Sequence, residues 1–236
     1  MIWLEDEADL RPFNGTLQDL CNEYGPGVYT TMRTLNGCLI EAEAHASRLG
    51  ISVSRLLAGV RKLYEDDGEV AFVALVSTRL AVWKLPLTSI PNPCKVQLVE
   101  HRGRDHPEIK SSDWVGLRAS MQAAKPVSCV EVIMMWQDEL GEGLMSNVVV
   151  FYRNGQIQTA PSARVLAGTT LRRLKQVCSI TEVAPKWSER REWEAMLVMN
   201  QPWLILQVAE IHFDSVGFKL PPTPKRVLEA IDGAMQ

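Results

Sequence analysis

Four short stretches of this 236-residue chain carry side chains with chemical potential. Lys110 supplies an amine, Glu142 supplies a carboxylate between two glycines, and Arg48 supplies a guanidinium. The fourth stretch, Gly168-Thr169-Thr170, is predicted at a helix start, where free backbone N–H groups and two hydroxyls suit a phosphate. Each stretch also has an ordinary interpretation as a surface lysine, a turn glutamate, a solvated arginine or a simple helix cap.

The elements that would position these residues form a mixture of strands and helices without an even βαβα rhythm. This pattern predicts an α+β protein in two lobes. We place the boundary after residue 105, which gives a smaller N-terminal α/β lobe over 1–105 and a larger C-terminal lobe over 106–236. Asn36-Gly37 and Asn154-Gly155 predict tight turns. The expected strands cover 27–36, 70–76, 96–99, 130–136, 147–152 and 156–159, and the expected helices cover 53–64, 113–124, 168–177, 189–196 and 227–234, with one more beginning near residue 41.

Composition excludes several classes of function. With 25 Lys and Arg against 28 Asp and Glu, the net charge is −3, and no basic block indicates binding to nucleic acid or to an anionic membrane. The apolar stretches are too short to span a bilayer, and the acidic start lacks a signal-peptide layout, so we expect a cytoplasmic protein. The five cysteines are scattered without a CxxC pair or a histidine at ligand spacing, which argues for reduced thiols and against a metal site.

Taken in chain order, these stretches resemble the class IV aminotransferases, the pyridoxal-phosphate (PLP) enzymes of fold type IV. The family includes branched-chain and D-amino acid aminotransferases and aminodeoxychorismate lyases. The resemblance covers roughly Gly27 to Val208, and it implies the two-lobed architecture of the D-amino acid aminotransferases. The segments similar to family motifs are Gly27–Arg33, His45-Ala46-Ser47-Arg48-Leu49 (HxxRL), Ile109-Lys110-Ser111, Glu142–Asn147 (ExxxSN), the hairpin Val148–Thr159, Leu166–Thr170 (LxGxT) and a late helix at Trp193-Glu194-Ala195-Met196.

The resemblance implies a role for each candidate side chain. Lys110 corresponds to the Schiff-base lysine, and Glu142 to the carboxylate that contacts the pyridine nitrogen. Tyr29 would bind substrate, while Arg33 would either orient a substrate carboxylate or form a structural ion pair. The residues expected to hold the cofactor phosphate are Arg48, Thr169, Thr170 and Asn200.

The chain also departs from the family pattern at the predicted phosphate site. Leu171 stands where the family often has an arginine after the threonine-containing loop. Asn200-Gln201-Pro202 stands where a serine or threonine often completes the phosphate cup. Asn200 could still donate to a phosphate oxygen, so these changes question the tightness of binding without excluding it.

Three functions follow as alternatives. The first is PLP-dependent transamination between an amino acid, or an amine, and a 2-oxo acid. The second is a pyruvate-releasing lyase of the aminodeoxychorismate type, which needs the same Lys110 and Glu142. The third is a binding protein that retains the fold without turnover. The resemblance also implies a homodimer, while the identity and stereochemistry of the donor stay open.

Overall fold

The computed structural model describes residues 1–65 and 68–235 and divides into two compact units. Unit 1 consists of Met1–Thr88 with Ile109–Ala119, and unit 2 consists of Ser89–Glu108 with Ser120–Gln236. This division differs from the expected boundary after residue 105 in two places. Strand β6 (Cys94–Glu100) pairs with strands of unit 2. The segment around Lys110, in contrast, returns to unit 1, because its backbone pairs with β2 (Val28–Leu35).

Unit 1 is built on a five-stranded sheet of order β1-β5-β4-β2-β3. The sheet grows from antiparallel neighbours, and the Asn36-Gly37 turn between β2 and β3 has positive φ at both residues, as a two-residue hairpin requires. The predicted strand and turn are confirmed here. The elements of unit 1 are β1 (Ile2–Leu4), α1 (Leu17–Tyr24), β2 (Val28–Leu35), β3 (Cys38–Leu39), α2 (Ala42–Leu49), α3 (Val53–Leu63), β4 (Ala71–Val76) and β5 (Leu80–Leu85).

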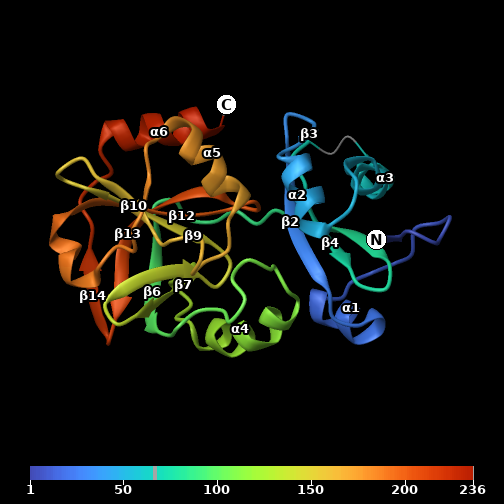
Figure 1. The fold of residues 1–236 in the computed structure, drawn as a ribbon, viewed down its shortest axis with the longest axis horizontal. Coiled ribbons are helices and arrows are strands. Elements are labelled where there is room, and N and C mark those ends of the chain that lie inside the picture. Colours follow the sequence, from blue (N-terminus) through green and yellow to red (C-terminus); the bar gives the residue numbers. More distant parts are fainter. Residues whose placement is uncertain (66–67, 236) are drawn as a thin grey trace. The chain divides into compact units, whose positions relative to one another are not determined.

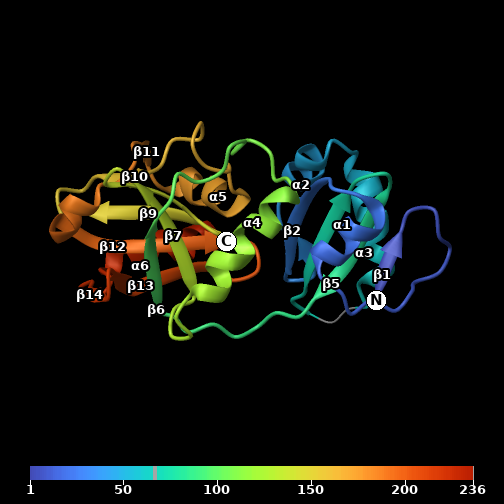
Figure 2. The ribbon, with the colours of Figure 1, turned by 90° about the horizontal axis from the view of Figure 1, so that it is seen from below.

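Helices cover both faces of the unit 1 sheet (Figure 2). Alternate residues of β4 face opposite sides, so Phe72 and Ala74 pack with α2 and α3, whereas Val73 and Leu75 pack with α1. Gly59 allows α3 to lie directly on the sheet, since a Cβ there would come within 2.7 Å of the Trp3 ring. β2 therefore lies in a sheet that is packed on both faces.

Unit 2 is built on a curled nine-stranded sheet of order β11-β10-β9-β12-β13-β6-β7-β8, with β14 paired to β13 (Figure 1). The parallel β6 pairs with β13 and β7, and the remaining neighbours are mostly antiparallel. The remaining elements are α4 (Asp113–Ala124, which crosses from unit 1), β7 (Glu131–Trp136), β8 (Glu139–Gly143), β9 (Asn147–Tyr152), β10 (Ile157–Thr159), α5 (Thr169–Val177), β11 (Thr181–Glu182), the 3₁₀ helix η1 (Trp187–Glu192), β12 (Trp193–Asn200), β13 (Leu204–Phe213), β14 (Val216–Lys219) and α6 (Lys225–Met235).

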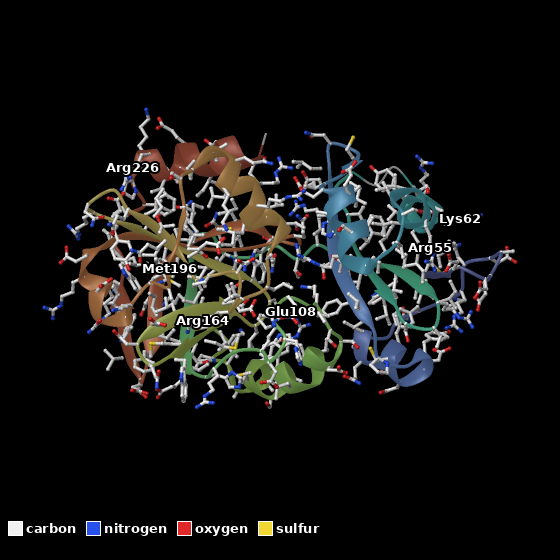
Figure 3. All side chains as sticks on the ribbon, viewed as in Figure 1. Arg55, Lys62, Glu108, Arg164, Met196 and Arg226 are labelled. Atoms are coloured by element: carbon white, nitrogen blue, oxygen red, sulfur yellow. The ribbon has the colours of Figure 1, made fainter. Side chains whose placement is uncertain are left out.

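The two faces of this sheet bury separate cores. Val148 and Val150 of β9 pack with Met196 of β12, labelled in Figure 3, inside the curl of the sheet. Val149 and Phe151 point to the opposite face, which α5 and α6 cover side by side (Figure 1). The α+β class predicted from the sequence is thus confirmed.

The predicted helix over residues 189–196 is wrong. Only Trp187–Glu192 forms a short 3₁₀ helix, and Trp193–Asn200 is the central strand β12. β12 is hydrogen-bonded to β9 on one side and β13 on the other, so long-range pairing outweighs the helix preference of Glu194-Ala195-Met196. Among the described residues, no helix has the length and hydropathy that a membrane span requires.

Candidate active site

Lys110 is attached to β2 by backbone hydrogen bonds. The Tyr29 amide donates to the Lys110 carbonyl at 3.0 Å, and the Ser112 amide donates to the Gly27 carbonyl at 2.9 Å. The Ser112 hydroxyl in turn accepts from the Gly27 amide at 2.9 Å. These bonds extend the sheet by a short bridge between Val28 and Ser111. The predicted lysine therefore stands on a well-anchored backbone, with its side chain partly exposed.

The amine of Lys110 lies over the aromatic ring of Tyr29. The Lys110 Nζ lies 4.9 Å from the centroid of the Tyr29 ring, a cation–π arrangement. Tyr29 is only 2 % exposed, so its ring is fixed by the core of unit 1. Its hydroxyl accepts a hydrogen bond of 3.3 Å from Nη1 of Arg118 on α4. Unit 1 thus brings together two predicted residues, Lys110 and Tyr29, and one arginine that was not predicted, Arg118.

His45 and Arg48 belong to the same helix, α2, three residues apart and hence on one face. His45 is fully buried, and its Nδ1 lies 2.7 Å from the hydroxyl of Thr30 on β2. Burial, together with the positive charges of Arg48 and Lys110, lowers the pKa of His45 to about 3. The imidazole is therefore neutral at pH 7, and its surroundings are cationic.

Arg33 lies at the opposite end of β2 from Tyr29. It forms an ion pair with Glu69, and its partner residue in the neighbouring strand is Ala71. Four residues of strand separate it from Tyr29, or about 13 Å. Of the two roles predicted for Arg33, the observed contact corresponds to the structural ion pair.

Glu142 is the predicted carboxylate, and in unit 2 it is nearly completely buried. Nε of Arg104 donates to its Oε1 at 2.7 Å, and the Leu166 amide donates to its Oε2 at 3.3 Å. The two side chains of this ion pair are 5 % and 3 % exposed. An arginine partner favours the ionised form of a glutamate, so the site presents a fixed negative charge.

A second buried carboxylate, Glu131, holds the turn that follows Glu142. Its Oε2 accepts hydrogen bonds from the Ser146 hydroxyl at 2.8 Å and from the Met145 amide at 3.1 Å. A Cβ on Gly143 would come within 2.3 Å of Ser146 Oγ and 2.8 Å of Glu131 Oε2, so only glycine fits there. The glycine and serine of the ExxxSN-like segment are thus explained by local packing.

Asn147, which ends this segment, connects it to the predicted phosphate loop. Its Nδ2 donates to the Leu166 carbonyl at 2.7 Å, so both backbone groups of Leu166 are bound by this segment. A Cβ on Gly168 would lie 1.8 Å from Asn147 Oδ1, which requires glycine at that position. The chain therefore enters α5 along a path that Glu142 and Asn147 set.

The N-terminus of α5 carries Thr169 and Thr170. No side chain caps this helix at Gly168, so the amides of its first turn stay available for an anion. Gln201 Nε2 lies 2.9 Å from Thr169 Oγ1 and 3.4 Å from Thr170 Oγ1. Because a hydroxyl can donate or accept, the Gln201 amide can also turn its Oε1 to the threonines and its NH₂ outward, as an anion would need.

Asn200 and Leu171 lie next to these donors in the sequence and make other contacts. The Asn200 Oδ1 accepts a hydrogen bond from the Trp203 amide at 3.0 Å and thereby shapes the turn between β12 and β13. Leu171 is buried in the core under α5, which is the reason for a leucine at that position. Gln201, not predicted from the sequence, is the residue of this turn that contacts both threonines.

Each unit thus gathers a separate part of the predicted set. Unit 1 holds Tyr29, Arg48 and Lys110, and unit 2 holds Glu142 with the two threonines. The residues that sequence reasoning missed are Arg104, Arg118, Glu131, Thr30 and Gln201. The partners named above lie 14 to 89 residues away, so no local pattern marks them. The only sequence signal was the position of Arg104 and Arg118 on either side of Lys110.

Comparison with known families gives a match over residues 85–211 to the family described as amino-transferase class IV. The matched segment is more than half of the chain and contains Lys110, Glu142, both threonines and Gln201. A comparison with curated proteins gives no match.

Solved structures of similar fold extend over the entire chain. A branched-chain amino acid aminotransferase candidate from Thermotoga maritima shares 18% identity at a TM-score of 0.73, covering 99% of this chain and 95% of the other. The PLP-bound form of a hypothetical aminotransferase from Mycobacterium tuberculosis shares 20% identity at a TM-score of 0.73, covering 100% and 98%. The 4-amino-4-deoxychorismate lyase from Pseudomonas aeruginosa shares 12% identity at a TM-score of 0.71, covering 98% and 97%.

Proposed function

The chain belongs to the class IV aminotransferase family, and from this premise we propose that it is a PLP-dependent enzyme that moves an amino group between an amino acid or amine and a 2-oxo acid. A PLP-bound aminotransferase among proteins of the same fold supports the choice of cofactor. The observation that carries the proposal is the position of Lys110, whose backbone is bound to β2 and whose amine lies over the Tyr29 ring.

The residues of unit 2 suit the charges of this cofactor. The uncapped start of α5, with the hydroxyls of Thr169 and Thr170, is an arrangement of donors that binds phosphate. We assign Gln201 to the same set, and we keep Asn200 as a second amide donor. The buried carboxylate of Glu142 is the anion that would bind a protonated ring nitrogen. These side chains fit the group by charge and by donor type.

The residues of unit 1 suit the reacting end. When bound, PLP supplies an aldehyde and a ring that withdraws electrons from the substrate's α-carbon. Lys110 would hold the cofactor through its amine, and its Nζ is the group that would move the proton at that α-carbon. Arg48 supplies a guanidinium for the phosphate, and Tyr29 contacts the substrate. Arg33, paired with Glu69, has the structural role.

The experiment is an absorbance scan of the purified protein with added PLP. We expect a long-wavelength band in the wild type and its loss in Lys110→Ala. Lys62→Ala is the matched control, because Lys62 is an exposed lysine of the same unit, on α3 (Figure 3). A band that survives in Lys110→Ala, or a wild type without a band, contradicts the catalytic assignment and favours a binding protein that retains the fold.

A lyase is the second candidate, because one protein of the same fold is a 4-amino-4-deoxychorismate lyase. Both reactions would use Lys110 and Glu142, so the residues do not separate them. A transaminase loses its long-wavelength band when an amino donor is added alone. A lyase instead releases pyruvate from aminodeoxychorismate without any 2-oxo acid acceptor.

We also propose that the enzyme is a cytoplasmic homodimer. The five cysteines are all free thiols, as expected in a reducing compartment. The resemblance to dimeric class IV enzymes supports the assembly. Light scattering on the purified protein would give twice the 26.4 kDa chain mass for a dimer, and fractionation of cells would test the location.

A further inference from the structure

Arg118 lies beside the reacting lysine through a shared neighbour. The Tyr29 phenol binds Arg118 at its hydroxyl, at 3.3 Å, and faces the Lys110 amine with its ring, at 4.9 Å from the centroid. All three residues belong to unit 1. Since the Tyr29 ring is buried and its strand is paired with β4 and bridged to Ser111, this contact fixes a guanidinium one side chain away from Lys110.

Arg118 lies on the face of helix α4 that packs against the core of unit 1. Trp114 is buried at the start of this helix, and Val115 packs against the core that contains Tyr29. Arg118 follows these residues by four and three positions, so it lies on the same face. Its side chain is partly buried, whereas the neighbouring Leu117 and Ala119 are exposed.

The charge of Arg118 is not neutralised by the protein. Over residues 1–65 and 68–235, no carboxylate forms an ion pair with it, and its hydrogen bond goes to the neutral phenol. Other arginines of unit 1, such as Arg55 with Glu5 and Arg11 with Glu23, do form ion pairs. A guanidinium has five N–H donors in a planar fork that fits a carboxylate, and this one uses a single donor.

We propose that Arg118 binds the carboxylate of the substrate and thereby makes amino acids, rather than simple amines, the donors of this enzyme. The inference rests on the proposed role of Lys110. The α-carbon that Lys110 deprotonates is one bond from the α-carboxylate, so the anion must lie near the lysine. Among the predicted residues, Arg48 and the threonines of α5 are assigned to the phosphate, and Arg118 supplies the second anion site.

The test compares two reagents that react with lysine-bound PLP through the same aminooxy group. Aminooxyacetate carries a carboxylate, and O-methylhydroxylamine does not. The second-order rate at which each one removes the long-wavelength band of the PLP-loaded enzyme is measured by stopped flow. Neither reagent requires knowledge of the natural donor.

We expect Arg118→Gln to slow aminooxyacetate roughly 10- to 100-fold, the usual range for a lost charge-assisted hydrogen bond, and to leave O-methylhydroxylamine unchanged. Arg118→Lys should recover part of the rate, because it keeps the charge without the fork. Tyr29→Phe should give a smaller selective loss, because Arg118 loses its anchor. Arg61→Gln, an exposed arginine on α3, is the matched control.

Three results would overturn the proposal. The first is equal slowing of both reagents, and the second is no change in either. The third is a tenfold weaker PLP affinity in Arg118→Gln, measured by tryptophan fluorescence, which would assign this arginine to the phosphate. Failure of the proposed function has a different signature, since the wild type would then show no lysine-dependent band, and this inference would fall with it.

Discussion

In unit 2 the carboxylates of Glu131 and Glu142 are buried together with the groups that bind them, whereas in unit 1 the buried histidine lies near two positive side chains. Glu142 is held by Arg104 and the Leu166 amide, and Glu131 by the Ser146 hydroxyl and the Met145 amide. His45, in contrast, is kept neutral by burial and by the charges of Arg48 and Lys110.

This difference indicates which charges each unit presents to a ligand. The buried carboxylate of Glu142 is paired with Arg104, so its charge is balanced without a ligand. Arg48 and Lys110 place two positive charges near a neutral imidazole, and such a region attracts anions. A phosphate and a carboxylate are the anions that a PLP enzyme brings. Unit 2 therefore supplies a preformed carboxylate together with the uncapped start of α5, and unit 1 supplies further positive charge that attracts anions.

Removing the arginine of the buried pair should have the largest effect on stability. Arg104→Met leaves Glu142 as an uncompensated buried charge, and we expect a loss of about 3–5 kcal/mol in the free energy of unfolding. In unit 1, Arg118→Gln removes no ion pair and should cost no more than about 1 kcal/mol. Urea denaturation of both variants measures the contrast.

The double variant Arg104→Met with Glu142→Leu provides the control for this prediction. Because it removes both charges, most of the lost stability should return. If Arg104→Met alone costs no more than Arg118→Gln, Glu142 is not an ionised partner of Arg104, and the contrast between the units is wrong.

Two glycine substitutions compare the units at the level of packing. In Gly168→Ala the new Cβ would lie 1.8 Å from Asn147 Oδ1, so this side chain must leave the Leu166 carbonyl. We expect a loss of about 1–3 kcal/mol in stability, the cost typical of overpacking. PLP affinity should fall by roughly tenfold, equivalent to about 1.4 kcal/mol, because the start of α5 is displaced.

Gly59→Ala is the counterpart in unit 1. Its Cβ would come within 2.7 Å of Trp3 and Val82, neither of which is assigned to the cofactor, and this destabilises the packing of α3 on the sheet. Thermal unfolding should show a loss in both variants, whereas a PLP titration should separate them. Equal PLP affinity in the two variants would show that the path of the chain into α5 does not matter for binding.

The parts of the fold that sequence reasoning predicted correctly are those with local signals. Asn36-Gly37 and Asn154-Gly155 each form the expected turn, since positive φ at Asn36, Gly37 and Gly155 is a local preference. The prediction of a helix at residues 189–196 was wrong for the opposite reason. The preference of β12 for strand comes from pairing with β9 and β13, and Glu194-Ala195-Met196 alone is typical of a helix.

The residues of the candidate site show the same division between local signals and long-range contacts. Lys110, Glu142 and the threonines of α5 stand in motifs, so their order along the chain was enough to propose them as candidates. Arg104 and Gln201 act through partners 38 and 32 residues away, and Arg118 acts through one 89 residues away. Only the fold brings such pairs together, and for that reason the carboxylate-binding residue proposed here could not be predicted from one sequence.

The smallest expected effect concerns the pH dependence that His45 confers. Its pKa of about 3 in the folded protein lies below the ordinary 6.5, so the unfolded chain binds one more proton between these values. The contribution of His45 to the free energy of unfolding is fully present above pH 6.5 and is lost as the pH falls toward 3, with a slope of at most about 1.4 kcal/mol per pH unit.

Urea denaturation at pH 7.5, 6.5 and 5.5 should show a decline in the stability of the wild type that is weaker in His45→Gln, while the effects of the other histidines cancel in the difference. Parallel curves would mean that His45 charges equally in both states, and the interpretation of unit 1 as a cationic region around a neutral imidazole would then be wrong.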